Sequence, residues 1–349
     1  MKILLAKRRA LGDTVLLGST VELLKKSFPA AEVSVLVPAA FAPVLEGHPG
    51  IAKIYRFEDG FFSNMGRLRA EKFDYFFQLH ASPQTRWLAW ASGAGQVLFH
   101  YQNNETEKAY GKHPNALEWD ACFLRSVFGE QISVPAHTPR IYLSVAEAAE
   151  GARFWKKWGL EGKQVILFGL GASRATKRWP AAHFARLAEL LRDRLDLYPA
   201  FITGPGEEEA LFAGKVLDEL RAKGLRAIPE GGGKGDFIHA VGLSVRDLAK
   251  ASSAVRAYAG NDSGPKHIAV AVGTPTFTFF GPEDPVEWHP YSTEEHPVFF
   301  IPKLHCRAED NGRWCGIAEC VEEKHRCMAD LDPLDAYHAI ETKVGGFHV

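Results

Sequence analysis

Short apolar runs alternate with helix-like segments along most of this 349-residue chain, and this alternation limits the possible folds more than any other feature. The first apolar run is Lys2–Ala6, and apolar residues recur at a helical spacing over Thr14–Phe28. Pro29 ends that helix, and a second apolar run covers Glu32–Val37. Strands that alternate with helices favour parallel sheets with helices on both faces. The sequence therefore predicts an α/β protein.

The alternation continues through both halves of the chain. In the first half, we expect further strands at 51–57, 73–79 and 96–101, helices at 83–91 and 115–128, and a polar loop at 102–115. In the second half, we expect strands at 164–168, 199–203, 225–228 and 255–259, and helices at 181–195, 208–223 and 244–251. A helix over 144–158 separates the halves.

This pattern predicts two similar, doubly wound domains. We expect a Rossmann-like domain at residues 1–143, a connecting helix at 144–160, a second Rossmann-like domain at 161–330, and a C-terminal helix or tail at 331–349. Ligands of such sheets bind at the carboxyl ends of the strands. The expected binding site is therefore a cleft between two domains that face each other.

Composition excludes several classes of function. The formal net charge of −1 does not suit a nucleic-acid-binding protein. Lys7-Arg8-Arg9 interrupts the N-terminal apolar run too early for a signal peptide, and no apolar run reaches the roughly 18–20 residues that span a bilayer. We therefore expect a cytoplasmic protein, which can still lie against a membrane.

The stretch best suited to bind a ligand runs from Gly260 to Pro275. It reads as a strand end, a tight turn and a short helix, in which Asp262 or Ser263 can cap the helix and Pro265 falls in the first turn. Such a helix start presents free backbone N–H groups and partial positive charge, which bind phosphate. An ordinary capped helix of an α/β domain fits the same pattern.

Four sequence blocks together carry a family resemblance. They are Leu11-Gly12-Asp13, Lys177-Arg178-Trp179-Pro180, the stretch from Gly260 to Ala269, and Phe280-Gly281-Pro282-Glu283-Asp284-Pro285. In this order and spacing they resemble the heptosyltransferases of glycosyltransferase family nine, which build the inner core of lipopolysaccharide. The resemblance implies a GT-B fold, an ADP-heptose donor, inversion at the anomeric carbon and chemistry that requires no metal or other cofactor. It also implies a lipid-linked core oligosaccharide acceptor and a peripheral position on the inner membrane.

Asp13 is the predicted catalytic base. It follows a strand end, and in an inverting transfer one carboxylate takes the proton of the acceptor hydroxyl as that oxygen attacks. The resemblance assigns this role to the matching Asp. A helix N-cap is the other role that fits Asp13, and the two do not exclude each other.

The predicted donor site lies in the second domain. Lys177 follows a turn that contains Gly169, Gly171 and Ser173, and a cation there can neutralise the leaving diphosphate. The resemblance places this Lys on the phosphates and makes Ser173 the candidate hydroxyl. A surface lysine is the alternative.

The remaining donor-site candidates also rest on the resemblance. Asp262 either caps its helix or contacts the heptose; Ser263, Gly264 and His267 contact the phosphate; Glu207 contacts the ribose; and Leu243 and Ser244 line the adenine pocket. A histidine on a helix face can equally be a structural residue. Lys266 is expected to be exposed.

Arg67, Arg69 and Lys72 are the acceptor-binding candidates. The resemblance implies that the first domain binds the acceptor, and an anionic, phosphorylated lipid acceptor needs cations there. These three residues follow one another within one segment of that domain. A solvated basic face explains the same pattern.

Four of the five cysteines gather in the loop at 305–328. Cys306, Cys315, Cys320 and Cys327 are separated by eight, four and six residues, so none forms the C-x-x-C pair typical of zinc sites. A structural zinc site, reduced thiols and disulfides all remain open, and a metal is not expected in catalysis.

Two other functions remain open beside the heptosyltransferase. One is a related glycosyltransferase with another nucleotide sugar or acceptor, because phosphate-binding motifs do not read the sugar. The other is a nucleotide-binding relative that has lost catalysis, against which the presence of both Asp13 and Lys177 argues.

Overall fold

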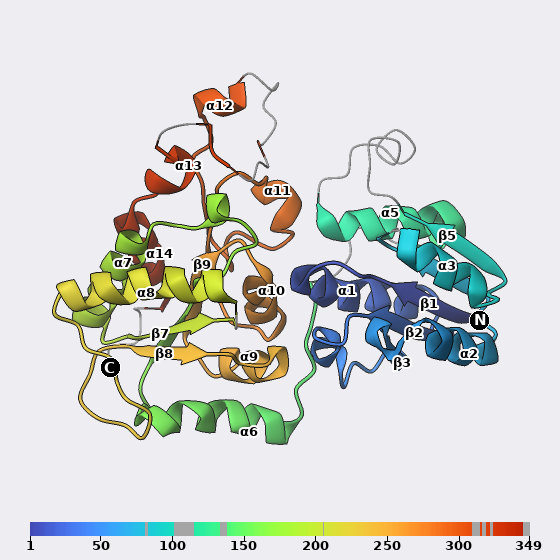
Figure 1. Cartoon of the computed structure of the whole chain (residues 1–349), viewed down its shortest axis with the longest axis horizontal. Coiled ribbons are helices and arrows are strands. Elements are labelled where there is room, and N and C mark those ends of the chain that lie inside the picture. Colours follow the sequence, from blue (N-terminus) through green and yellow to red (C-terminus); the bar gives the residue numbers. More distant parts are fainter. Residues whose placement is uncertain are drawn as a thin grey trace. The chain divides into compact units, whose positions relative to one another are not determined.

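The computed structural model describes residues 1–80, 83–100, 115–132, 138–204, 206–308, 315, 319–321 and 324–344 (Figure 1). The chain divides into two compact units, Met1–Tyr142 and Leu143–Val349. Each unit contains one parallel sheet covered by helices on both faces. The expected α/β class is therefore confirmed.

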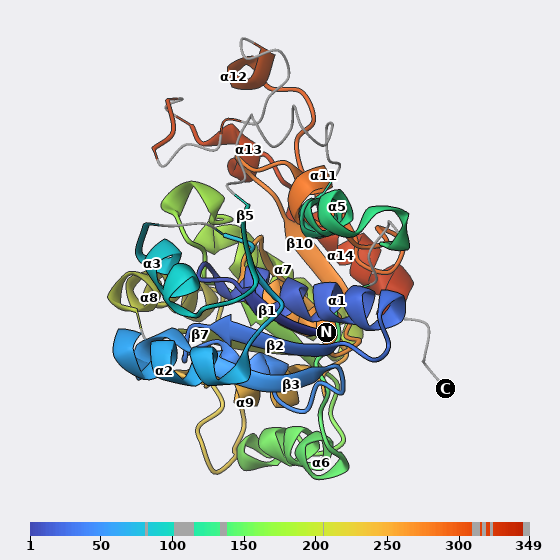
Figure 2. The same ribbon diagram turned by 90° about the vertical axis from the view of Figure 1, so that its right-hand side faces the viewer.

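The first unit is built on a five-stranded sheet in the order β3-β2-β1-β4-β5. Its strands are β1 (Lys2–Ala6), β2 (Glu32–Val37), β3 (Ile51–Arg56), β4 (Tyr75–Gln78) and β5 (Gln96–Phe99). Helices α1 (Leu11–Ser27) and α5 (Ala116–Phe128) cover one face, and α2 (Phe61–Glu71) and α3 (Pro83–Ala91) cover the other (Figure 2). Because both faces of β1 and β2 are covered, these strands are continuous apolar runs.

The second unit is built on a six-stranded sheet in the order β11-β10-β9-β6-β7-β8. Its strands are β6 (Val165–Gly169), β7 (Tyr198–Thr203), β8 (Ile238–Val241), β9 (Ala257–Asn261), β10 (Thr276–Phe279) and β11 (Val298–Phe299). Helices α7 (Ala181–Leu195), α8 (Glu207–Ala222) and α14 (Pro333–Val344) pack together, as do α6 (Val145–Phe154), α9 (Val245–Ser252) and α10 (Gly264–Ala271). Three short helices complete the unit, α11 (Pro285–Trp288), α12 (His305–Ala308) and α13 (Arg326–Ala329).

Short 3-10 turns join several of these elements, at Ala42–Leu45, Phe57–Asp59, Gly129–Gln131, Trp155–Trp158 and Ala175–Lys177. The last of these carries the predicted phosphate-binding lysine.

Helix α6 belongs to the second unit because it packs tightly against α9. Ser144 and Glu147 cap its start reciprocally, and Glu147 also binds Arg246 of α9 at 2.7 Å. A side chain at Gly151 would collide with the backbone oxygen of Lys250, so only glycine permits this approach.

The structure corrects one expectation drawn from the sequence. The strand expected at 225–228 is absent, since only an isolated bridge joins Ala227 to Phe237, and β8 forms at Ile238–Val241 instead. The later apolar run pairs with β7 in parallel, with Ala200 opposite Ile238 and Thr203 opposite Val241. Residues 101–114, most of the loop expected at 102–115, lie outside the described residues, and Asn115 caps α5.

Candidate active site

Asp13 lies in the first turn of α1 and does not cap it. The helix begins at Leu11, immediately after the turn that follows β1, and the N-cap position belongs to Ala10. Asp13 is therefore the third helical residue, and the capping role that the sequence left open is wrong. Carboxyl ends of parallel strands share one edge, so Asp13 lies at the edge where ligands of such sheets bind.

A buried ion pair stands beside Asp13. Lys7, which follows β1 and is only 1% exposed, donates to the carboxylate of Asp120 on α5 at 2.6 Å. Thr20 of α1 donates to the same oxygen at 3.2 Å. Burial disfavours the charged ammonium, but the negative charges of Asp120 and Asp13 outweigh it and raise the pKa of Lys7.

The same surroundings set the protonation of Asp13. Burial raises the pKa of its carboxyl group and the charge of Asp120 adds to this, while Lys7 and Arg9 act in the opposite direction. A carboxylate with a raised pKa accepts a proton more readily than an exposed one, which suits a general base.

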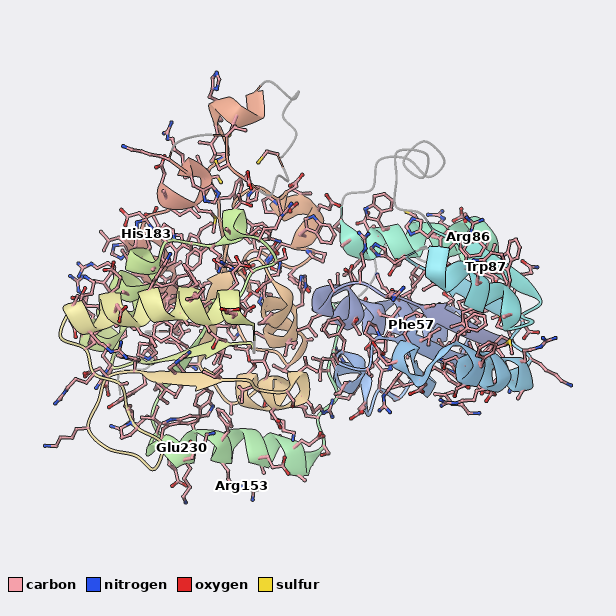
Figure 3. The ribbon with its side chains drawn as sticks, in the orientation of Figure 1. Phe57, Arg86, Trp87, Arg153, His183 and Glu230 are labelled. Atoms are coloured by element: carbon pink, nitrogen blue, oxygen red, sulfur yellow. The ribbon has the colours of Figure 1, made fainter. Side chains whose placement is uncertain are left out.

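His80 follows β4 at this edge. Burial and the charges of Lys7 and Arg9 lower its pKa to about 4, so it is neutral at physiological pH. Arg8 lies over the ring of Phe57, 5.8 Å from its centre, just beyond β3 (Figure 3). Its position at a strand end was the one feature of His80 that could be recognised from the sequence.

The three acceptor-binding candidates, Arg67, Arg69 and Lys72, lie on α2 or at its end, and Arg67 binds Asp59, which follows β3 at the carboxyl-terminal edge of the sheet. Lys72 follows Glu71, whose carboxylate binds Lys2 at the start of β1 with an N–O distance of 3.3 Å. The last turn of α2 therefore lies toward the amino-terminal edge of the first sheet, opposite Asp13. Their role in binding an acceptor stays a prediction.

In the second unit, Asp262 joins two lysines. Its Oδ2 lies 2.6 Å from Nζ of Lys177, and its Oδ1 accepts from Nζ of Lys266, also at 2.6 Å. Burial alone would raise the pKa of Asp262, but the two ammonium groups outweigh it and hold this pKa well below its usual range. We call these three residues the Lys177–Asp262–Lys266 cluster.

Lys266 is buried, which contradicts the expectation that it is exposed. It is 0% exposed, and its ammonium also donates to the carbonyl of Trp288 at 2.8 Å. Asp262 lies just before α10, and the four-residue spacing lets the Lys266 side chain reach back to that carboxylate. Burial lowers the pKa of Lys266, and the attraction of Asp262 offsets part of this effect.

Asn261, the last residue of β9, fixes the loop that carries Lys177. Its side-chain oxygen accepts from the backbone N–H of Trp179 at 2.8 Å, and its amide donates to the carbonyl of Leu170 at 3.0 Å. The ring of Trp179 stacks on Phe279 in the core. The loop between β6 and α7 is therefore tied to β9 at both ends.

Two glycines of the sequence blocks are needed for close packing. A Cβ atom at Gly260 would lie 2.6 Å from the carbonyl oxygen of Gly169 and would also meet the hydroxyl of Tyr258. A Cβ at Gly281 would lie 2.7 Å from the sulfur of Met328 and 3.0 Å from the carbonyl oxygen of Thr176. Both glycines thus hold the Lys177 loop close to the sheet edge.

The start of α10 combines a free helix end with a neutral histidine. Ser263 holds the N-cap position without a side-chain capping bond, and Gly264 begins the helix. His267 is buried, and burial with the charge of Lys266 lowers its pKa well below the ordinary value. Its Nδ1 is hydrogen-bonded to the hydroxyl of Tyr291, which leaves Nε2 as the other atom that can meet a ligand.

The other donor-site candidates follow neighbouring strands. Ser173 lies after β6, Glu207 begins α8 after β7, Leu243 lies after β8, and Ser244 caps α9. All four are at the carboxyl-terminal edge that also carries the Lys177–Asp262–Lys266 cluster. Their contacts with a donor remain predictions.

Glu209 is an edge residue that the sequence did not single out. Its carboxylate accepts from the backbone N–H of Gly204 at 2.6 Å, and a side chain at Gly171 would collide with it. Glu207 is exposed, whereas Glu209 is half-buried between the loops after β6 and β7. Because three glutamates follow one another here, only the helical period could have indicated which of them faces the sheet edge.

The cysteines are described only in part of their loop. None of the five forms a disulfide, and the described residues contain no group of three His, Cys, Asp or Glu side chains suited to a metal. Much of the segment between Cys306 and Cys327 lies outside the described residues. A structural zinc site there remains an untested prediction.

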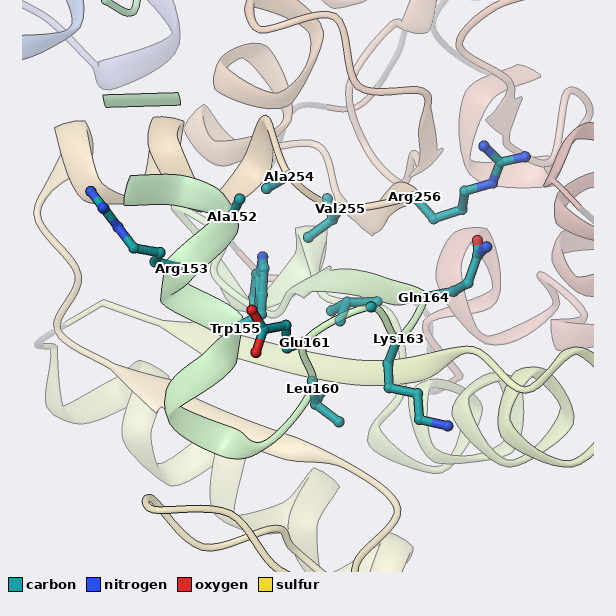
Figure 4. Close-up of a pocket in the computed structure, with 12 residues that line it drawn as sticks. Ala152, Arg153, Trp155, Leu160, Glu161, Lys163, Gln164, Ala254, Val255 and Arg256 are labelled. Carbon is teal, nitrogen blue, oxygen red and sulfur yellow. The ribbon is translucent and has the colours of Figure 1, made fainter. Parts of the chain in front are cut away.

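A pocket of about 500 Å³ lies away from the cluster (Figure 4). Its lining includes Gln164 and Arg256, which precede β6 and β9, together with Trp155 and Lys163. It therefore opens at the amino-terminal edge of the second sheet, and we do not assign it to the candidate active site.

Comparison with known proteins identifies the family. A model of glycosyltransferase family 9 (heptosyltransferase) matches residues 67–311. Lipooligosaccharide heptosyltransferase 2 of Haemophilus influenzae is 26% identical over 323 residues, which cover 84% of this chain and 86% of that relative. Lipopolysaccharide heptosyltransferase 3 of Escherichia coli is 24% identical over 308 residues, covering 80% of this chain and 84% of the relative.

Two solved structures share the fold. A family 9 glycosyl transferase from Veillonella parvula has a TM-score of 0.78 at 19% identity, with 99% of this chain and 98% of that chain covered. The ADP-heptose lipopolysaccharide heptosyltransferase II of Escherichia coli has a TM-score of 0.75 at 18% identity, with the same coverage of 99% and 98%. Both confirm the expected GT-B type of α/β fold.

The described helices include none with both the length and the apolar character needed to cross a bilayer. The family match covers most of the chain, and it contains the Lys177 loop and the Asp262–His267 block. The resemblance drawn from the sequence is thus confirmed: the chain belongs to glycosyltransferase family 9, the heptosyltransferase family, and is a glycosyltransferase.

Proposed function

We propose that the protein transfers heptose from ADP-heptose to a sugar hydroxyl of the lipopolysaccharide inner core, with inversion at the anomeric carbon. The observation that carries this proposal is the Lys177–Asp262–Lys266 cluster at the start of α10. Two ammonium groups against one carboxylate leave an excess positive charge beside free helix N–H groups, which suits a diphosphate. The names of the relatives, among them an ADP-heptose lipopolysaccharide heptosyltransferase, support this choice of donor and acceptor.

The reaction is a single displacement. The acceptor oxygen attacks the anomeric carbon and its proton passes to Asp13, while the bond between that carbon and the diphosphate oxygen breaks. Lys177 and the N–H groups at Ser263 and Gly264 stabilise the negative charge that develops on the leaving ADP. The buried, proton-accepting environment of Asp13 supports its role as base. The step requires no cofactor in this scheme.

The acceptor is lipid-linked, so we also propose that the enzyme works as a peripheral protein on the cytoplasmic face of the inner membrane.

Calorimetric titration with ADP-heptose, UDP-glucose and GDP-mannose tests the donor, with EDTA present throughout. We expect selective binding of ADP-heptose, and we expect Lys177→Met to weaken it at least tenfold, roughly 1.4 kcal/mol. Lys163→Met is the matched control, because Lys163 is exposed and lies at the other edge of the same sheet. Equal binding of all three nucleotide sugars would refute the donor assignment and favour a transferase for another sugar.

A further inference from the structure

Every exposed large aromatic side chain in the described part of the chain lies on α2 or α3. Phe62 is 79% exposed, Trp87 is 69% exposed, Trp90 is 61% exposed and Phe61 is 42% exposed. Soluble proteins rarely leave such a group of large apolar side chains in water without a partner. This concentration on two helices therefore marks an interaction surface.

Each helix carries one pair of these aromatic side chains on its exposed side. On α3, Thr85 and Leu88 point inward, while Trp87 and Trp90 lie one turn apart with ring centres 6.4 Å from each other. Helices α2 and α3 pack side by side on the same face of the first sheet (Figure 2). Arg86 and Trp87 both project from α3 in Figure 3. We call this surface the α2–α3 aromatic face.

Basic residues dominate the charge of this face. The segments Phe61–Lys72 and Pro83–Ala91 contain four of them, Arg67, Arg69, Lys72 and Arg86, and one acid, Glu71. That acid is bound by Lys2 and Lys53, and Asp59 pairs with Arg67 at 2.6 Å. An excess of positive charge therefore remains on the two segments that carry the exposed aromatic side chains.

This combination suits a bilayer better than a second copy of the chain. Tryptophan and phenylalanine insert at the boundary between head groups and acyl chains, and Lys and Arg beside them attract anionic lipids. A symmetric dimer through this face would bring the same basic side chains together and repel itself.

We propose that the α2–α3 aromatic face docks the enzyme on an anionic phospholipid bilayer. This inference rests on the membrane association proposed above, and it does not depend on the donor or on the catalytic base. It also gives Arg69 and Lys72 a role that fits their distance from Asp13, because they contact lipid phosphates rather than the acceptor sugar.

Cosedimentation of the whole chain with vesicles tests the proposal. The vesicles are phosphatidylcholine alone, or equal parts of phosphatidylcholine and phosphatidylglycerol. We expect wild-type protein to partition onto the anionic vesicles, and Trp87→Ser/Trp90→Ser to do so at least about tenfold more weakly. Leu211→Ser on α8, which removes a 66% exposed side chain of the other unit, is the matched control and should bind like wild type.

The charges are tested separately. Arg69→Gln/Lys72→Gln should weaken binding to anionic vesicles by roughly an order of magnitude, with the loss greatest at low salt, because each cation contributes through the surface potential. Lys215→Gln, an exposed lysine on α8, should change binding little. Circular dichroism and the Tm of each variant serve as the folding control, because the substitutions lie in the first unit and ADP binding in the second unit would not report on its folding.

The outcomes separate the claims. If wild type binds and the Trp variant binds equally well, this face is not the docking surface. If wild-type protein binds neither kind of vesicle, the docking role of this face and the proposed membrane association are both wrong. Transfer to a delipidated, soluble acceptor would then still test the proposed chemistry. A wild-type dimer that the Trp variant converts to a monomer would overturn the proposal in favour of self-association.

Discussion

Replacing Lys266 with methionine removes one of the two ammonium groups that hold Asp262. The variant keeps the length of the side chain and its packing inside α10, but loses the 2.6 Å contact with the carboxylate and the 2.8 Å hydrogen bond to the carbonyl of Trp288. Asp262 retains Lys177 as its partner. The change thus tests whether Lys266 compensates the charge of Asp262 or merely fills space.

The size of the effect follows from what is left unpaired. Removing one partner of a buried ion pair costs about 3–5 kcal/mol when the other charge stays alone. Because Lys177 still neutralises Asp262, we expect Lys266→Met to lower the free energy of unfolding by only about 1–2 kcal/mol. Asp262→Asn leaves Lys266 buried without a counter-charge, so we expect the full 3–5 kcal/mol, roughly.

The double variant decides the question. Asp262→Asn/Lys266→Met carries neither buried charge, so it should be more stable than Asp262→Asn alone. Calorimetric unfolding of all four proteins measures this, since 1 kcal/mol shifts the Tm by roughly 2–4 °C in a unit of this size. Additive losses in the double variant would show that the two side chains do not interact, and would refute the charge-compensation argument.

The same variant should alter ligand binding. The cluster loses its excess positive charge when Lys266 is replaced, while Lys177 and the start of α10 remain in place. We expect ADP to bind about tenfold more weakly at low ionic strength, and the difference to shrink as salt screens the charge. A loss that does not respond to salt would indicate a change of shape instead.

Three further predictions concern protonation. Burial raises the pKa of Asp13 above its ordinary 3.8, so the stability of the wild-type protein falls as the pH rises from 3.8 through that raised pKa. The Tm of Asp13→Asn should therefore exceed that of the wild type at neutral pH, and the difference in Tm should disappear in acid. Asp120→Asn removes a negative charge that raises the pKa of Asp13, so the acidic limb of the plot of kcat/KM against pH should move to lower pH. An unchanged acidic limb would exclude an effect of Asp120 on the protonation of Asp13. Hydrogen bonds from Arg246 and from Ser144 lower the pKa of Glu147 from 4.5 to about 2. Glu147→Gln should therefore lower the free energy of unfolding by about 1 kcal/mol at neutral pH, and the Tm difference from wild type should narrow as the pH falls from 4.5 toward 2.

Much of the sheet architecture was predictable because central parallel strands are uninterrupted apolar runs. The sequence predicted Lys2–Ala6, Glu32–Val37 and helix Ala181–Leu195 with the limits that the structure has. The run at 225–228 is equally apolar, yet β8 forms at 238–241. Local composition cannot decide which of two short runs pairs with β7, because that choice depends on contacts distant in sequence.

The residues of the candidate site that belong to the ordered sequence blocks could be predicted. The partners that their side chains bind could not. The structure brings together Lys177 and Asp262, as the sequence blocks suggest. The burial of Lys266 was missed because lysines are seldom buried, although its four-residue spacing from Asp262 was a usable signal. The bonds from Asn261 to the Lys177 loop join residues more than 80 positions apart, and no local pattern encodes them.

The transfer rate of Asp13→Asn tests the central claim most directly. This variant keeps the shape of the side chain but cannot accept the acceptor proton, so ADP-heptose should bind with unchanged affinity while transfer to a core acceptor falls by at least roughly 100-fold. The pair of measurements uses one protein, with calorimetry for binding and the initial rate for transfer. Transfer at the wild-type rate with intact donor binding would contradict the account, because it would remove Asp13 from the reaction.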